Sequence, residues 1–251
     1  MLVTVSKMMN SKGKVILLFC LLLSPGLVVW GQEIPQPVNR DLETWNSISF
    51  KYRFNKHIRL KLIEQVRLEN VSTQLDRWIN QAELQLRPSP DLEFDFAFRH
   101  SLNIDRNGNR QGIENYFRFH LDVTHNIEFG RWEFSNRVRL QRGDQIGIRK
   151  QDGDYPANAV RFKSAARHNL KRWKYDPVIA WELFYTRQTG ELDWVSPFRF
   201  YFGTDWKTKK NQRMGIHYIW EREIALWNPR NTHILRLKYS FSKKSARMEK
   251  P

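Results

Sequence analysis

The side chains that could support catalysis are scattered along the chain. The spacing of the seven histidines matches neither a Ser-His-Asp triad nor a metal-ligand pattern. His120, two residues before Asp122, is the best single candidate for acid–base chemistry, although a hydrogen bond inside the fold explains the pair more simply. Cys20 is the only cysteine, which excludes a disulfide framework. The sequence therefore predicts no catalytic, cofactor-binding or metal-binding residues.

Basic side chains dominate the charge of the chain. Lys and Arg total 42 against 26 Asp and Glu, a formal net charge of +16. The bases are spread evenly instead of forming one patch, which argues against a nucleic-acid partner.

Residues 1–31 read as a secretory signal peptide. Lys7, Lys12 and Lys14 precede an apolar stretch, Val15–Trp30, and Gly31 offers a small residue for cleavage. The segment also holds Cys20, so the exported chain would lack cysteine. We predict that the protein leaves the cytoplasm, which further disfavours nucleic acid.

From Trp45 to Phe241 apolar and polar residues alternate with a period of two, which indicates β-strands with two different faces. The pattern yields eleven candidate strands, many as long as the roughly 9–11 residues that a tilted strand needs to cross a bilayer. Tryptophans cluster near the ends of the runs, as in the aromatic girdle of a membrane barrel. They are Trp45, Trp78, Trp132, Trp173, Trp194, Trp206 and Trp220.

We therefore predict an all-β fold: a transmembrane, antiparallel, up-and-down β-barrel in the bacterial outer membrane. Short and longer connections alternate along the chain, as expected when short turns face the periplasm. Because such barrels have an even number of strands, we expect twelve strands, with ten as the alternative. Residues 32–44 would form a periplasmic lead-in, 45–241 the barrel and 242–251 a basic tail.

The polar faces of these strands would line the lumen, with more bases than acids. The lumen-lining candidates are Arg99, Arg118, His120, Arg137, Arg139, Arg199 and Arg236. Two interpretations stay open and are compatible. Arg–carboxylate pairs could brace the wall, because buried ions need partners, and the unpaired bases could favour anions, as in phosphate pores.

Several short motifs resemble a family of outer-membrane barrels called domain of unknown function 2490. They include Leu42–Trp45, Phe50–Lys56, Glu64–Leu68, Leu75–Trp78, Asn107–Arg110 and the ending Ile234–Phe241. The resemblance implies an outer-membrane barrel of unassigned activity and carries over no site residues. Members of such families often end near the aromatic that Phe241 resembles, whereas here residues 242–251 follow.

Three functions remain open on the sequence alone. The first is a barrel that forms a narrow anion-preferring pore or a structural element. The second is a lipid-modifying barrel enzyme, and the third is a secreted soluble barrel that binds a ligand inside. For the first, we expect outer-membrane lipid, small anionic solutes and the barrel-assembly machinery, acting through the C-terminal strand, as partners.

Overall fold

The computed structural model describes residues 40–106, 111–148, 156–188, 194–224 and 229–245. All regular structure in these ranges is β. The strands are β1 (Arg40–Arg53), β2 (Ile58–Glu69), β3 (Gln74–Leu86), β4 (Leu92–Asp105), β5 (Gly112–Phe129), β6 (Trp132–Gln145), β7 (Ala157–His168), β8 (Asp176–Gln188), β9 (Trp194–Lys209), β10 (Gln212–Arg222) and β11 (Asn231–Lys244). Within these ranges, no helix is long and apolar enough to cross a membrane.

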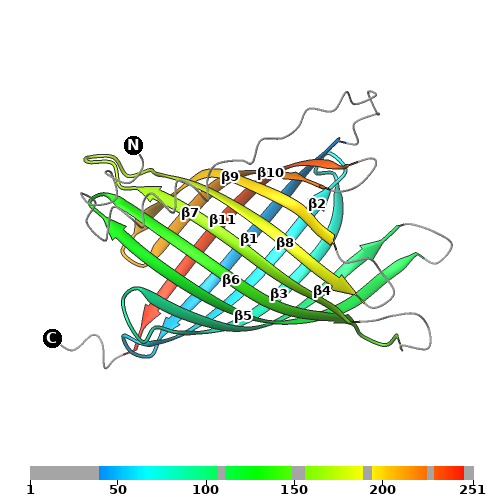
Figure 1. The fold of residues 1–251 in the computed structure, drawn as a ribbon, viewed down its shortest axis with the longest axis horizontal. Coiled ribbons are helices and arrows are strands. Elements are labelled where there is room, and N and C mark those ends of the chain that lie inside the picture. Colours follow the sequence, from blue (N-terminus) through cyan, green and yellow to red (C-terminus); the bar gives the residue numbers. More distant parts are fainter. Residues whose placement is uncertain (1–39, 107–110, 149–155, 189–193, 225–228, 246–251) are drawn as a thin grey trace, which may run out of the picture. The chain divides into compact units, whose positions relative to one another are not determined.

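The strands form one closed barrel, in which each strand pairs with its neighbours in the sequence (Figure 1). All consecutive pairs are antiparallel, but β1 and β11 close the barrel in parallel, from Arg40 opposite Asn231 to Arg53 opposite Lys244. Beside the Arg40–Asn231 pair, at the start of both strands, the Arg230 Nη2 lies 2.7 Å from Asp41 Oδ2, and this ion pair links the two strands.

The predicted closed β-barrel is confirmed, but the predicted number of strands is not. We expected twelve strands, or ten, and the described residues form eleven. An even number is needed only when every pair is antiparallel, and the parallel seam removes that requirement. The seam also draws residues 40–44 into β1 and residues 242–244 into β11, so the barrel wall extends past both predicted boundaries.

The connections divide the barrel into two ends. At the turn end lie the links after β1, β3, β5, β7 and β9, including the two-residue turn at 130–131, where Gly130 has a φ of +61°. Glycine adopts this left-handed conformation without the steric cost that a Cβ brings. At the loop end lie the links after β2, β4, β6, β8 and β10. The longest of them joins β6 to β7.

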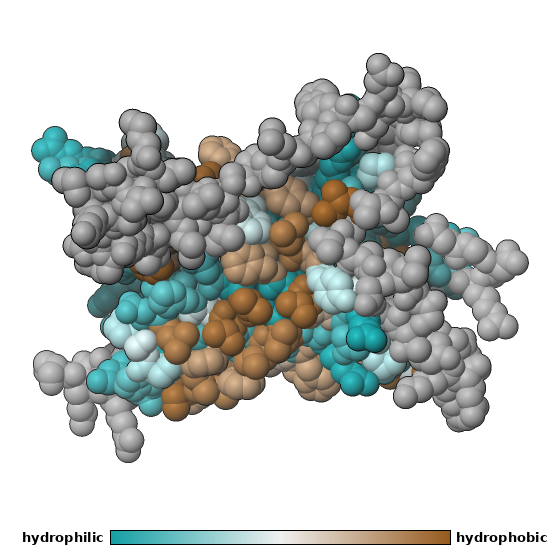
Figure 2. Space-filling model, in the orientation of Figure 1, coloured by the Kyte–Doolittle hydropathy of each residue, from teal (hydrophilic) through white to brown (hydrophobic). Residues whose placement is uncertain are grey.

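The apolar residues of the alternating strands point outward. Phe96, Phe119, Leu140 and Phe202, on four different strands, all have exposed side chains. In Figure 2 hydrophobic residues form a band across the visible wall, and hydrophilic residues flank it on both sides. The polar set of each strand therefore faces the interior, because successive side chains of a strand alternate between its two faces.

Trp45 is an exception to the predicted aromatic girdle. Its side chain is only 5% exposed and packs in an interior cluster with Tyr201, Ile219 and Ile234. The correction follows from parity, since Trp45 lies on the same face of β1 as the inward Lys51. Of the other predicted girdle residues, Trp78, Trp132 and Trp173 are exposed and Trp206 and Trp220 half-buried, while the side chain of Trp194 lies outside the described set.

Three polar residues interrupt the apolar outer face in one row. Glu64, Asn80 and His100 are successive cross-strand partners on β2, β3 and β4. The Trp78 Nε1 donates a hydrogen bond to Glu64 at 3.0 Å, and His100 Nε2 lies 3.3 Å from Asn115 Oδ1. These breaks in the alternation are therefore a continuous polar row, whose two outer members form hydrogen bonds with neighbouring side chains.

The interior apolar cluster predicts a difference between two isoleucines of β10. Ile219 is fully buried inside the barrel, whereas Ile216 points outward and is 43% exposed. Replacing a packed core Ile with Ala costs about 2–5 kcal/mol because it leaves a cavity. We expect Ile219→Ala to lower the free energy of unfolding in detergent micelles by that amount, and Ile216→Ala by much less. Equal losses in denaturant titrations would contradict the described interior packing.

Candidate functional site

An interior cavity of about 580 Å³ lies inside the barrel. All strands except β10 contribute to its wall, because the inward face of nearly every strand carries long polar side chains. Six of the seven lumen-lining candidates border this cavity: Arg99, Arg118, Arg137, Arg139, Arg199 and Arg236. The seventh, His120, is buried beside them.

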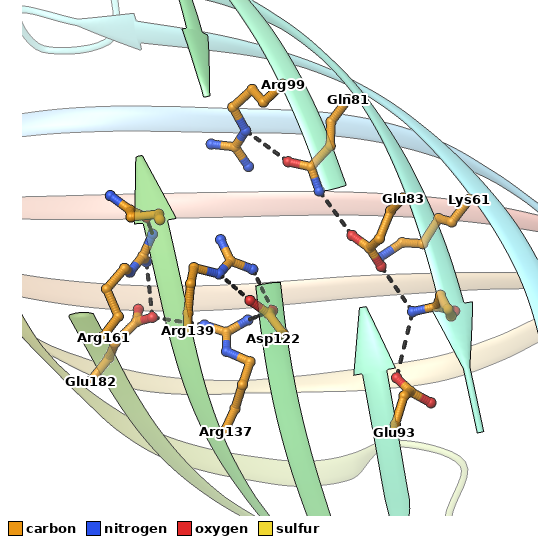
Figure 3. Close-up of polar contacts among 12 residues, drawn as sticks. Lys61, Gln81, Glu83, Glu93, Arg99, Asp122, Arg137, Arg139, Arg161 and Glu182 are labelled. Carbon is orange, nitrogen blue, oxygen red and sulfur yellow. Dashed lines mark hydrogen bonds and ion pairs between the residues drawn. The ribbon is translucent and has the colours of Figure 1, made fainter. Parts of the chain in front are cut away.

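Two buried carboxylates hold two of these arginines, and also Arg161, against the wall of β5–β8 (Figure 3). Arg139 makes a bidentate contact to Asp122, with Nε–Oδ1 at 2.6 Å and Nη2–Oδ2 at 2.7 Å. Arg137 bridges Asp122, at 3.4 Å, and Glu182, at 2.8 Å. Arg161 also reaches Glu182, at 2.9 Å. The chain of alternating charges braces four neighbouring strands from inside.

Glu182 is the most buried acid of this network. Its side chain is 1% exposed, and besides the two arginines it accepts a hydrogen bond from the Tyr201 hydroxyl at 2.5 Å. Tyr201 belongs to the apolar cluster around Ile219. The ionic brace and the apolar cluster are therefore physically joined at one side chain.

A second network, centred on Glu83, spans the adjoining strands, β2–β4. Lys61 Nζ lies 3.2 Å from Glu83, and the amides of Gln81 and Gln85 donate to it at 2.8 Å each. Arg99 Nε donates to Gln81 at 2.7 Å. Figure 3 shows how this relay links Arg99 to an acid only through a neutral amide.

Many interior bases have no carboxylate partner in the described part of the chain. They are Lys51, Arg53, Arg67, Arg99, Arg118, Lys163 and Arg236. Two of them stack on aromatic rings instead: Arg67 Cζ lies 3.8 Å from the Trp45 ring centroid and Lys163 Nζ 3.7 Å from that of Tyr201. The interior thus carries an excess of positive charge.

Arg118 is the least satisfied of these bases. Its Nε and Nη2 are buried and have no hydrogen-bond partner. Arg99 is its direct cross-strand partner on β4. Both line the main cavity and a second cavity of about 320 Å³, and Arg77 borders both cavities as well.

This arrangement suits an anion. Guanidinium groups present planar, forked donors that match carboxylate and phosphate oxygens. Buried charges without partners are costly, and a bound anion would offset that cost. The Arg99–Arg118 pair is therefore the candidate site for an anionic ligand, and beside it lies Arg77, which is paired with Asp76 at 2.7 Å.

His120 does not form the acid–base pair considered from the sequence. Neither of its ring nitrogens has a hydrogen-bond partner, and Asp122 is occupied by Arg139 and Arg137. Within the residues described, no group of three or more His, Cys, Asp or Glu could hold a metal ion.

Sequence reasoning missed two features of the site. The alternation of β8 places Glu182 on the inward face, but it could not show that Arg137, Arg161 and Tyr201 converge on this one carboxylate. The stacking of Arg67 and Arg199 on Trp45 was hidden because Trp45 was assigned to the girdle.

The brace predicts that Glu182 matters more for stability than an exposed acid with a similar partner. Removing one member of a buried ion network costs about 3–5 kcal/mol, since its partners stay buried and charged. Glu133, whose side chain is 46% exposed, pairs with Arg167 at 3.3 Å and serves as the control, since exposed pairs contribute about 0–1 kcal/mol. Guanidinium titrations of Glu182→Gln and Glu133→Gln in micelles measure the difference. Similar midpoints for both variants would refute the brace.

The comparisons with known proteins give one family and no closer relative. No curated protein and no solved structure matches the chain. A family model described as a protein of unknown function, DUF2490, matches residues 42–225. This range runs from β1 past the end of β10 and includes Arg99, Arg118 and Glu182. The chain therefore belongs to the DUF2490 family of proteins of unknown function.

Proposed function

We propose that this protein is a bacterial outer-membrane barrel whose lumen forms a narrow, anion-preferring pathway. The observation that carries the proposal is the Arg99–Arg118 pair, which lies inside a closed barrel and lacks carboxylate partners among the described residues. Rings of Arg and Lys are the usual way in which pores favour anions.

The membrane location is supported by the two faces of the wall. Large apolar side chains such as Phe119 and Phe202 are exposed outside, while charged residues fill the interior. A soluble barrel would show the reverse, with its apolar residues inside. A bilayer accepts strands only when their backbone groups are all paired, and the closed barrel meets that condition.

The topology also supports an orientation. Short turns face the periplasm in bacterial barrels and longer loops face outside, so the turn end would be periplasmic. β11 ends at the turn end, with Lys244 as its last residue, whereas β1 runs parallel to it and begins with Arg40 at the loop end, so this orientation does not agree with the predicted periplasmic lead-in. We infer that β11 is the strand that the barrel-assembly machinery would engage from the periplasm.

The bracing and anion-binding interpretations of the lumen apply to different parts of it. Asp122 and Glu182 brace the wall of β5–β8. The unpaired Arg99 and Arg118 lie on β4 and β5 and border the second cavity together with Asp144, near the loop end of β6. An anion entering from the loop end would meet these arginines.

The alternatives have less support. A lipid-modifying enzyme needs a nucleophile beside a base, and His120 has no hydrogen-bond partner for either ring nitrogen. A secreted soluble barrel would dissolve without detergent. The outward Phe96, Phe119 and Leu140 make that behaviour unexpected.

The proposal predicts anion selectivity that depends on Arg118. In planar bilayers under a KCl gradient, the wild-type protein should give a reversal potential of the sign set by chloride. Arg118→Gln should move that potential toward zero, because it removes one unpaired lumen charge. Lys56→Gln, which removes the same charge from an exposed position in the turn after β1, should leave it unchanged.

Two outcomes would contradict the pathway. Cation selectivity of the wild-type protein would refute the anion preference. Absence of conductance from protein that has inserted into the bilayer would refute the pathway, and the structural role of the barrel would be the remaining interpretation.

A further inference from the structure

We propose that the outer wall binds an anionic, phosphate-bearing lipid, with its head group against Arg142, Asn158 and Arg187 and its acyl chain in an adjoining apolar groove. This inference rests on the membrane location proposed above. It concerns the outside of the barrel and is independent of the pathway through the lumen.

The groove runs over the outer faces of β2–β8 and has a volume of about 870 Å³. Exposed apolar side chains line it, including Phe96, Phe119, Leu140, Val160 and Tyr185. Ala82, the cross-strand partner of Phe98, also lines it. The volume falls within the range of roughly 300–1,000 Å³ typical of ligand pockets.

Two arginines with an asparagine between them, here called the basic row, close the groove at the loop end. Arg142 on β6 is directly opposite Asn158 on β7, and Asn158 is directly opposite Arg187 on β8. All three side chains are exposed and line the groove. No ion pair of Arg142 occurs among the described residues.

The depth of the row fits a lipid head group. Arg142 lies three residues before the end of β6, Asn158 is the second residue of β7, and Arg187 is the penultimate residue of β8. All three are therefore at the loop end, which the proposed orientation places in the outer leaflet. An outward Arg costs several kcal/mol at the bilayer midplane but little near the interface, so this is where such residues are tolerated.

The proposed site for the head group and the proposed site for the acyl chain adjoin each other on the same strands. Leu140, Val160 and Tyr185 each lie two residues from a member of the basic row, on the same outer face and farther from the loops. An amphiphile with a negative head and an apolar tail would satisfy both features at once. Arg is suited to the head group because its planar donors match phosphate oxygens.

The row argues against a second copy of the chain as the occupant. In a two-fold dimer the same surface meets itself, so Arg142 and Arg187 would face arginines of the partner. Like charges brought together at an interface cost several kcal/mol. An anionic lipid neutralises the row instead.

Native mass spectrometry of the full-length protein released from detergent tests the site. The probes are diphosphorylated lipid A, zwitterionic phosphatidylcholine of similar chain length, and inorganic phosphate. The wild-type protein should retain lipid A in preference to phosphatidylcholine, and inorganic phosphate should not displace it. Arg142→Gln with Arg187→Gln should weaken retention by about tenfold or more, as expected when charge-assisted hydrogen bonds are lost.

Two further variants separate head group from tail. Val160→Trp fills the groove without changing the charge and should also weaken retention of lipid A. Lys209→Gln with Lys210→Gln removes two exposed bases at the opposite end of the barrel and should have no effect.

Equal retention by the Arg142/Arg187 double variant and by the Lys209/Lys210 control would overturn the inference. So would equal binding of phosphatidylcholine, or displacement by inorganic phosphate together with an unaffected Val160→Trp variant. If in any of these cases the protein still requires detergent and inserts into bilayers, the lipid site is refuted but the proposed function stands. If the protein is soluble without detergent, both the lipid site and the proposed function are refuted.

Discussion

Closure of the sheet is the constraint on which the rest of this structure depends. An open barrel would leave a row of backbone donors and acceptors without partners, at a cost that no side chain could offset in a membrane. The chain meets the constraint with an odd number of strands, because β1 and β11 pair in parallel. Once the sheet is closed, every strand has one face toward an enclosed interior and one toward the surroundings.

The enclosed interior explains the charge pattern. Side chains there cannot all be solvated by bulk water, so acids and bases must pair or find other partners. Asp122 and Glu182 hold arginines from β6 and β7, and aromatic rings support Arg67 and Lys163. Among the described residues, too few acids face the interior to pair with the rest. In the function proposed here, this unpaired excess would favour anions in the lumen, and the outward Arg142 and Arg187 would extend the same chemistry to the lipid side.

Much of the fold could be predicted because period-two alternation is a local property. The run from Ile48 to Phe54 shows its two faces without any knowledge of its neighbours, and so do the strands around Phe96 and Phe119. The alternation itself yields eleven candidate strands, the number observed, and only the expectation of an even number led to twelve or ten. What the local pattern could not show is that β1 meets β11 in parallel, a contact between residues almost two hundred positions apart in the sequence.

The candidate site could be predicted only in part, for a related reason. Parity identifies Arg99 and Arg118 as inward residues, but it cannot say which bases find an acid across the interior. Glu182 collects two arginines and Tyr201, whereas Arg118 finds no partner. Trp45 was misassigned because aromatic residues at strand ends suit both a membrane interface and an interior cluster, and its parity with Lys51 was not applied.

The most direct test of the central claim is the accessibility of consecutive residues of β5 in a bilayer. Single cysteines at Arg118, Phe119, His120 and Leu121 would carry a nitroxide spin label, and collision rates would be measured with oxygen, which partitions into lipid, and with a water-soluble nickel complex. The account predicts high oxygen accessibility at Phe119 and Leu121 and low oxygen accessibility at Arg118 and His120. The opposite alternation, or no alternation, would contradict it.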